Sequence, residues 1–160
     1  MAKSKEEKTN VMRTLEQKKI PYTAHSYDPE GPIDGVSVAQ TLGQPAEQVF
    51  KTLVTKGASG AYYVFDIPVA ENLDLKKAAK AVGEKSVAML PQKELLGLTG
   101  YVHGGCSPVG MKKQFPTVFH ETALLYGTVC VSAGKIGHQV ECDPNALIAL
   151  LRAKTADVIV

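Results

Sequence analysis

The chain has 160 residues, 44% of them hydrophobic and 21% charged, and a formal net charge of +2. This composition is typical of one globular domain over residues 1–160 and excludes fibrous and intrinsically disordered proteins. The small net charge does not indicate a DNA-binding protein, and no apolar run is as long as a membrane span. The odd number of cysteines gives no disulfide framework and favours the reducing cytoplasm.

The first third of the chain predicts two helices separated by a strand and a loop. In order, these are a helix with a capping box at residues 4–7, a strand at 22–27, a turn-rich loop at 28–35, and a helix from Ser37 to Gly43. Val11, Met12 and Leu15 form the apolar face of the first helix. Residues 45–48 begin with proline and predict one further helical turn.

The rest of the chain predicts short strands interspersed with helices. A hairpin pairs residues 49–55 with 61–67 through the turn at 57–60. The remaining expected elements are helices at 75–82, from Pro91 to Gly97 and after Asp143-Pro144, and strands at 86–89, 117–120, 128–132 and 138–141. Strand pairs close in sequence favour antiparallel or mixed pairing, so the expected fold is α+β around a mixed sheet or small barrel.

Residues 104–110, Gly-Gly-Cys-Ser-Pro-Val-Gly, form the most informative stretch. Glycines and a proline at this density predict a loop whose backbone N–H groups point into one concavity, which suits a phosphate or a developing oxyanion. A plain surface turn is the alternative. A nucleotide-binding P-loop is excluded, because Met111 precedes Lys112 and Lys113 stands where a magnesium-binding hydroxyl is required.

Lys51 shares one face of its expected strand with Val49 and Leu53. A lysine on an apolar face either extends to the solvent at the rim or projects into a pocket, where it can bind a carbonyl oxygen or a phosphate. Ser132 begins a second turn of small residues that runs through Gly134. That turn either connects a hairpin or forms the rim of a pocket.

Cysteine and metal chemistry are weaker alternatives. Cys106 could act as a nucleophile with His103 or His120 as its base, but no third residue that would orient the base stands at a telling spacing. A zinc site drawn from His103, Cys106, His138 and Cys142 matches no strong zinc-finger signature. We therefore expect neither a metal nor a cofactor.

Three motifs, taken together and in this order, resemble one known family. They are residues 49–54 (Val-Phe-Lys-Thr-Leu-Val), residues 104–110, and residues 131–135 (Val-Ser-Ala-Gly-Lys). They resemble the YbaK/EbsC branch of the aminoacyl-tRNA editing domains, the free-standing Cys-tRNA(Pro) deacylases, from the first helix to Asp157. The strand lysine together with the Gly-Gly-x-Ser-Pro-x-Gly loop is specific, whereas either one alone is not.

The resemblance implies a single α/β domain, a mixed barrel-like sheet with helices packed outside, that acts on the acceptor end of aminoacyl-tRNA. It implies that Lys51 enters the pocket to hold the aminoacyl ester and the neighbouring phosphate region, and that the Gly110 N–H binds the ester carbonyl oxygen. The other pocket positions that it implies are Tyr27, Gly104, Gly105, Ser107, Pro108, Ser132, Gly134 and Gln139. Some relatives carry a carboxylate at the position of Gln139.

The chemistry implied by the resemblance needs no nucleophile from the protein. The substrate's own cysteine thiol attacks its ester and releases tRNA and a cyclic thiolactone, while the protein supplies orientation and an oxyanion site. Relatives rely on prolyl-tRNA synthetase to hold the tRNA, so that synthetase is an expected partner, and Cys-tRNA(Cys) is a further expected substrate. The alternatives are a deacylase for Ala- or Ser-tRNA, which would need an activated water, and a catalytically silent module that binds an aminoacyl, nucleotide or peptide end.

Overall fold

A computed structural model describes residues 8–160 of the chain. The capping box at residues 4–7 lies outside the described residues. Residues 8 and 9 are not helical, so the first helix, α1 (Asn10–Gln17), begins later than expected. Thr9 is its N-cap, and the Thr9 hydroxyl accepts a hydrogen bond from the Met12 N–H at 3.2 Å.

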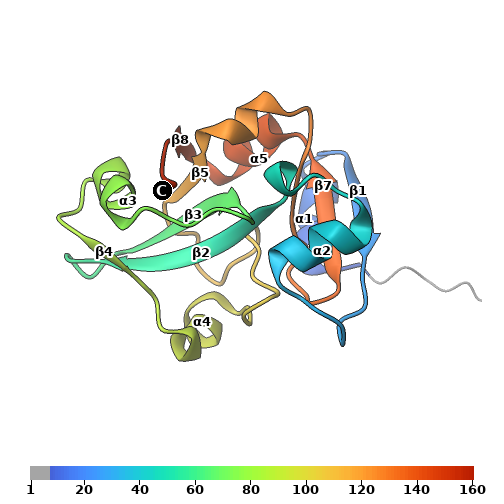
Figure 1. Ribbon diagram of the computed structural model, residues 1–160, viewed down its shortest axis with the longest axis horizontal. Coiled ribbons are helices and arrows are strands. Elements are labelled where there is room, and N and C mark those ends of the chain that lie inside the picture. The colour runs from blue at the N-terminus through green and yellow to red at the C-terminus, as the bar shows by residue number, and fades with distance from the viewer. Residues whose placement is uncertain (1–7) are drawn as a thin grey trace, which may run out of the picture.

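The described strands form two sheets, seen side by side in Figure 1. The smaller sheet is antiparallel and has the order β1 (Tyr22–Ser26), β7 (His138–Cys142), β6 (Val129–Ser132). The larger sheet has the order β4 (Val87–Met89), β2 (Phe50–Gly57), β3 (Tyr62–Pro68), β5 (Thr117–His120), β8 (Lys154–Ala156). Its β3–β5 and β5–β8 pairs are parallel and its other pairs are antiparallel, which confirms the expected mixed α/β architecture.

The two sheets meet at one point rather than closing into a barrel. Val49, which directly precedes β2, forms an isolated parallel bridge with Cys130 of β6. The Val69 N–H also donates to the Val49 carbonyl oxygen at 2.8 Å, so the start of β2 is fixed on both sides. This junction between the sheets positions the cavity described below.

Four further helices and two 3-10 turns connect the described strands. They are α2 (Gly35–Leu42), α3 (Leu75–Val82), α4 (Gln92–Thr99), α5 (Pro144–Leu151), η1 (Ala46–Gln48) and η2 (Glu121–Leu125). The N-cap of α2 is Asp34 and not Ser37, because the Asp34 carboxylate accepts from the Ser37 N–H at 3.1 Å. Helix α4 continues past Gly97 and ends before Gly100. None of the helices in residues 8–160 is long and apolar enough to cross a bilayer.

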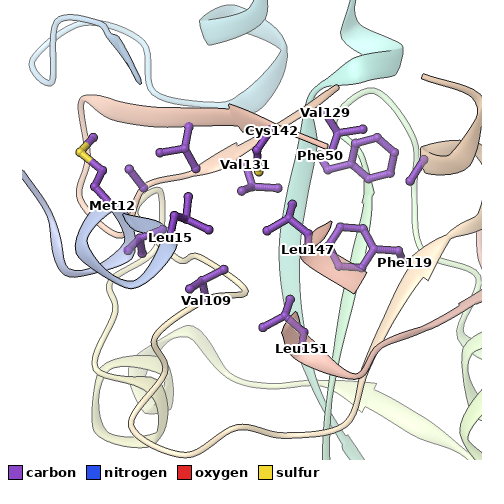
Figure 2. Packing of buried hydrophobic residues seen from close by; sticks show 14 residues of the cluster. Met12, Leu15, Phe50, Val109, Phe119, Val129, Val131, Cys142, Leu147 and Leu151 are labelled. Atoms are coloured by element: carbon purple, nitrogen blue, oxygen red, sulfur yellow. The ribbon is translucent and has the colours of Figure 1, made fainter. Parts of the chain in front are cut away.

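The largest hydrophobic core lies between α1, α5 and one face of the smaller sheet (Figure 2). Val131 and Cys142 point into it from the sheet, Leu15 from α1 and Leu147 from α5. All four of these side chains are almost fully buried, and burial of such apolar groups is the main force that holds the layers together.

The opposite face of the smaller sheet carries polar residues. Because side chains alternate along a strand, Ser132 of β6 and Gln139 of β7 point away from the core and lie directly opposite each other. Cys130 lies on this second face and packs against Ala39 of α2 and Val49. Helix α2 therefore covers this polar face, as Figure 1 also shows.

Candidate active site

A cavity of about 360 Å³ lies where the two sheets meet, under the N-terminal end of α2. Its walls come from the loop before α2, the start of α2, β2, the loop around residue 104, and the ends of β6 and β7, with Val69 after β3 and Leu95 of α4. This volume falls within the range of small-molecule sites, near its lower end. The lining combines valine and leucine side chains with a few polar groups.

Five of the ten site residues expected from the sequence line this cavity. They are Tyr27, Lys51, Gly104, Ser132 and Gln139. These residues come from segments that lie far apart in the sequence. The structure thus places the strand lysine, the glycine loop and the Val-Ser-Ala-Gly-Lys turn around one space.

Of the described residues that line the cavity, Lys51 is the only lysine, and none is an arginine. Its ammonium group makes no hydrogen bond or ion pair with any residue that the structure describes. Burial lowers the pKa of Lys51, and the nearby Glu71 carboxylate partly opposes this effect. A half-buried ammonium without a partner is electrostatically unsatisfied, so an anionic or strongly polar ligand would stabilise it.

The other five expected residues, Gly105, Ser107, Pro108, Gly110 and Gly134, do not line the cavity. Ser107 is fully buried, and its hydroxyl accepts from the Val109 N–H at 3.2 Å, which shapes the loop from within. Gly110 has a φ of +83°, and a Cβ there would lie 2.7 Å from the Tyr101 hydroxyl oxygen. These two constraints alone explain glycine at position 110, and its role at the ester carbonyl stays a prediction.

Gln139 is held by a partner that the sequence did not reveal. The Gln44 Nε2 donates to the Gln139 Oε1 at 2.7 Å, and the Gln139 Nε2 donates to the Gln44 Oε1 at 3.1 Å. This reciprocal pair fixes the plane of the Gln139 amide, which is only 4% exposed. The polar group at this position is therefore a neutral amide whose Oε1 and Nε2 each have one partner in Gln44.

The cysteine and zinc alternatives find no geometric support in the described residues. Burial raises the pKa of the Cys106 thiol to about 12, so the group is a thiol rather than a nucleophilic thiolate at neutral pH. His103, Cys106 and His138 line the cavity, but Cys142 points into the core on the other face of the sheet. No metal-binding cluster in residues 8–160 is formed by these four side chains.

Sequence reasoning missed a buried carboxyl group beside the site. Asp66 of β3 is fully buried opposite Thr52 of β2, and the Thr52 hydroxyl donates to the Asp66 Oδ1 at 2.6 Å. The Asp66 Oδ2 has no partner, and burial raises the Asp66 pKa to about 8. A single carboxyl group within the otherwise apolar run Tyr-Tyr-Val-Phe-Asp-Ile was the available signal.

The start of α2 is also part of the wall and was not expected there. Gly35 is the first residue of this helix, and a Cβ at Gly35 would lie 2.3 Å from the Val69 Cγ1. Both residues line the cavity. Glycine at position 35 therefore allows the helix start to lie directly against Val69 and close the cavity on that side.

We expect Gly35→Ala to destabilise the protein by about 1–3 kcal/mol, because the added methyl group must displace Val69 or the helix start. Gly97→Ala is the matched control, since a Cβ at this position inside α4 meets nothing within 4 Å. The control should stabilise by about 0.5–1 kcal/mol through helix propensity. Urea unfolding of both variants measures the difference, and equal effects would contradict the tight packing of Gly35.

Comparison with known proteins matches this chain to one family. The family model of the aminoacyl-tRNA editing domain matches residues 34–150. A protein of Enterococcus faecalis named "Putative Cys-tRNA(Pro)/Cys-tRNA(Cys) deacylase EbsC" is 48% identical over 160 residues, which cover 99% of this chain and 98% of that protein.

Solved structures agree with the sequence match. One, described as "a putative trans-editing enzyme for prolyl tRNA synthetase", is 29% identical, has a TM-score of 0.81 and is covered over 94% of both chains. Another, of a hypothetical protein, shares the fold with a TM-score of 0.86 at 23% identity, over 94% of this chain and 99% of the other. The chain belongs to the aminoacyl-tRNA editing domain family.

Proposed function

We propose that this protein is an aminoacyl-tRNA deacylase that removes cysteine from mischarged Cys-tRNA(Pro), and also from Cys-tRNA(Cys). The observation that carries the proposal is the unpartnered Lys51 ammonium in a cavity of about 360 Å³, in a chain 48% identical to a protein named for this activity. A cavity of this volume takes the aminoacyl group and part of the terminal nucleotide.

The reaction uses the substrate's own thiol as the nucleophile. The sulfur atom attacks the ester carbonyl carbon, a carbon–sulfur bond forms, and the carbon–oxygen bond to the ribose breaks. The proton of the thiol ends on the ribose hydroxyl, so the products are the free tRNA and a cyclic thiolactone. The protein's contribution is to hold the ester and thiol in a reactive geometry and to stabilise the negative charge that develops on oxygen.

The site residues expected from the sequence have the following roles in this scheme. Lys51 binds the ester and the neighbouring phosphate region and provides the nearest full positive charge. The loop at residues 104–110 supplies backbone N–H groups, with the N–H of Gly110 as the proposed donor to the carbonyl oxygen. Tyr27, Ser132 and the fixed Gln139 amide bind the substrate's remaining polar atoms. Cys106 remains a neutral thiol and takes no part in bond formation.

We further propose that residues 1–160 act as one editing domain in the cytoplasm and that prolyl-tRNA synthetase holds the tRNA body. The modest net charge of +2 supports this division of labour, because a protein that grips tRNA alone needs more phosphate contacts. The relative described as a trans-editing enzyme for prolyl tRNA synthetase has the same fold.

The test is a comparison of ester cleavage on three substrates. Purified protein is mixed with Cys-tRNA(Pro), Ala-tRNA(Pro) and Ser-tRNA(Pro), each labelled in the amino acid, with and without prolyl-tRNA synthetase. We expect rapid loss of label from the cysteine ester alone, because alanine and serine lack the thiol. Detection of the thiolactone by trapping with an amine distinguishes thiol attack from hydrolysis by water.

Two outcomes would contradict the proposal. Cleavage of the alanine or serine ester at a comparable rate would show that an activated water is the nucleophile. Stable esters in all three cases, with the synthetase present, would show a binding module instead. In that second case, binding of a non-hydrolysable aminoacyl-adenosine analogue would be measured by calorimetry.

A further inference from the structure

Three potential metal ligands gather on the polar face of the smaller sheet, outside the lining of the cavity. His25 of β1, Cys130 of β6 and Glu141 of β7 each place one ligand atom within 4.8 Å of the others. The strand register explains this cluster, because Cys130 lies directly opposite Glu141. On the other neighbouring strand, His25 lies two residues beyond Thr23, the partner of Glu141, and therefore on the same face. The strands therefore bring together residues that are more than 100 positions apart in the sequence.

Two of these three side chains, His25 and Glu141, already make hydrogen bonds. The His25 Nε2 and the Glu141 Oε1 are 2.8 Å apart, and the Thr128 hydroxyl donates to the Glu141 Oε2 at 2.5 Å. These bonds hold both oxygens of the Glu141 carboxyl group in place. The Cys130 thiol has no hydrogen-bond partner among the described residues and packs against Ala39 and Val49 beside the His–Glu pair.

We propose that His25, Cys130 and Glu141 bind one divalent transition-metal ion of the zinc type. An imidazole nitrogen, a thiolate and a carboxylate oxygen are ligands that Zn²⁺ and Co²⁺ accept, whereas Mg²⁺ and Ca²⁺ prefer oxygen alone. Burial raises the pKa of the Cys130 thiol to about 12, as it does for Cys106, so the thiolate forms only together with the ion. The ion displaces the thiol proton to the solvent, and a metal–sulfur bond forms. No redox change occurs, and water completes the coordination.

The geometry requires only small side-chain movements. Bonds to zinc are about 2.0–2.3 Å long, so ligand atoms on one tetrahedral ion lie roughly 3.3–3.8 Å apart. No present separation exceeds 4.8 Å, so the ligand atoms must approach by at most about 1–1.5 Å. The His25 Nε2 and the Glu141 Oε1, now 2.8 Å apart, must separate by about 0.5 Å and give up their hydrogen bond to the ion. The His25 and Glu141 side chains are 27% and 28% exposed, which leaves the site open to an incoming ion.

The neighbouring residues would support the bound ion. Thr128 already holds the second oxygen of Glu141, and the Gln48 Nε2 donates to the Thr128 carbonyl oxygen at 2.8 Å. Such outer partners orient metal ligands and strengthen binding. Because Ser132 and Gln139 line the cavity from β6 and β7, a metal ion at this cluster would tie together the strands that carry them.

Titration of the metal-free protein with Co²⁺ under reducing, oxygen-free conditions tests the proposal. We expect d–d absorption of a four-coordinate ion and a sulfur-to-cobalt charge-transfer band, both removed by one equivalent of Zn²⁺. Cys130→Ser should abolish the charge-transfer band, and His25→Gln or Glu141→Gln should weaken binding at least about tenfold. Zn²⁺ should also raise the melting temperature of the wild type.

Two other thiols serve as matched controls. Cys142→Ser alters a buried thiol on the opposite face of the same sheet, and Cys106→Ser alters the thiol at the cavity, so both variants should keep the band. Absence of any band at millimolar Co²⁺, or a band that survives Cys130→Ser, would overturn the proposal. If Cys130→Ser does not fold, Cys130→Ala and the two partly exposed ligand variants decide between these outcomes.

Discussion

Replacement of Lys51 by methionine is expected to lower the rate of Cys-tRNA(Pro) deacylation about 100- to 1,000-fold, as does loss of one charge-stabilising group in other acyl-transfer sites. Methionine keeps most of the length of the lysine side chain and removes only its charge. The fold should persist, because the Lys51 ammonium makes no hydrogen bond or ion pair within residues 8–160. Removal of a half-buried charge should even stabilise the protein slightly.

Two further variants make this result specific. Lys56→Met removes a charge from the same strand, but Lys56 is exposed on the other face, 5.7 Å from the Tyr62 ring centroid. This variant should retain full activity. Lys51→Arg keeps the charge in a larger, planar group and should recover only part of the rate. Single-turnover kinetics measure all three variants, and a fully active Lys51→Met enzyme would overturn the role of this lysine.

Replacement of Asp66 by asparagine is expected to stabilise the protein increasingly as the pH rises. The Asp66 pKa is about 8 in the folded protein against an ordinary value of 3.8. Between these two values the folded carboxyl keeps a proton that the unfolded carboxyl has lost, so the free energy of unfolding falls as the pH rises. The size of the effect is about 1.4 kcal/mol per pH unit, an upper estimate for a buried group.

Asparagine has nearly the same shape and stays neutral, so it still accepts the Thr52 hydrogen bond and carries no such penalty. Urea unfolding at about pH 5, 6, 7 and 8 should show a stability gain over the wild type that grows across the series. Asp34→Asn is the control, because Asp34 is exposed and its hydrogen bonds with Ser37 lower its pKa. Its stabilising charge is complete above the ordinary pKa and is lost only as the pH falls further, so its difference from the wild type should stay constant. A constant difference for Asp66→Asn as well would contradict a neutral Asp66.

Most elements were predictable because local patterns determine them. The helix at residues 75–82 follows from a capping Asp74 and a terminal Gly83, and the structure has α3 at these residues. Strand β8 was missed because it has only three residues and pairs in parallel with the distant β5, so nothing local specifies it. The N-cap of α2 was placed at Ser37 because the competing Asp34 lay in a segment interpreted as a loop.

The site was predictable where it coincides with a motif and unpredictable where it depends on proximity in three dimensions. Lys51 and Ser132 belong to short motifs, and both line the cavity. The Gln44–Gln139 pair and the contact of Gly35 with Val69 join residues that no spacing rule connects. Half of the expected residues do not line the cavity, because a loop needs glycine, proline and buried serine for its own shape.

The size of the cavity has a consequence for how tRNA species are told apart. A space of about 360 Å³ admits the aminoacylated end of the tRNA and excludes the anticodon arm and most of the acceptor stem. All tRNAs share the same terminal nucleotides, so two of them that carry the same amino acid present an identical group to this cavity. Preference for one tRNA body over another must then appear in the dissociation constant of the whole complex and vary with ionic strength, while the first-order rate of ester cleavage stays the same.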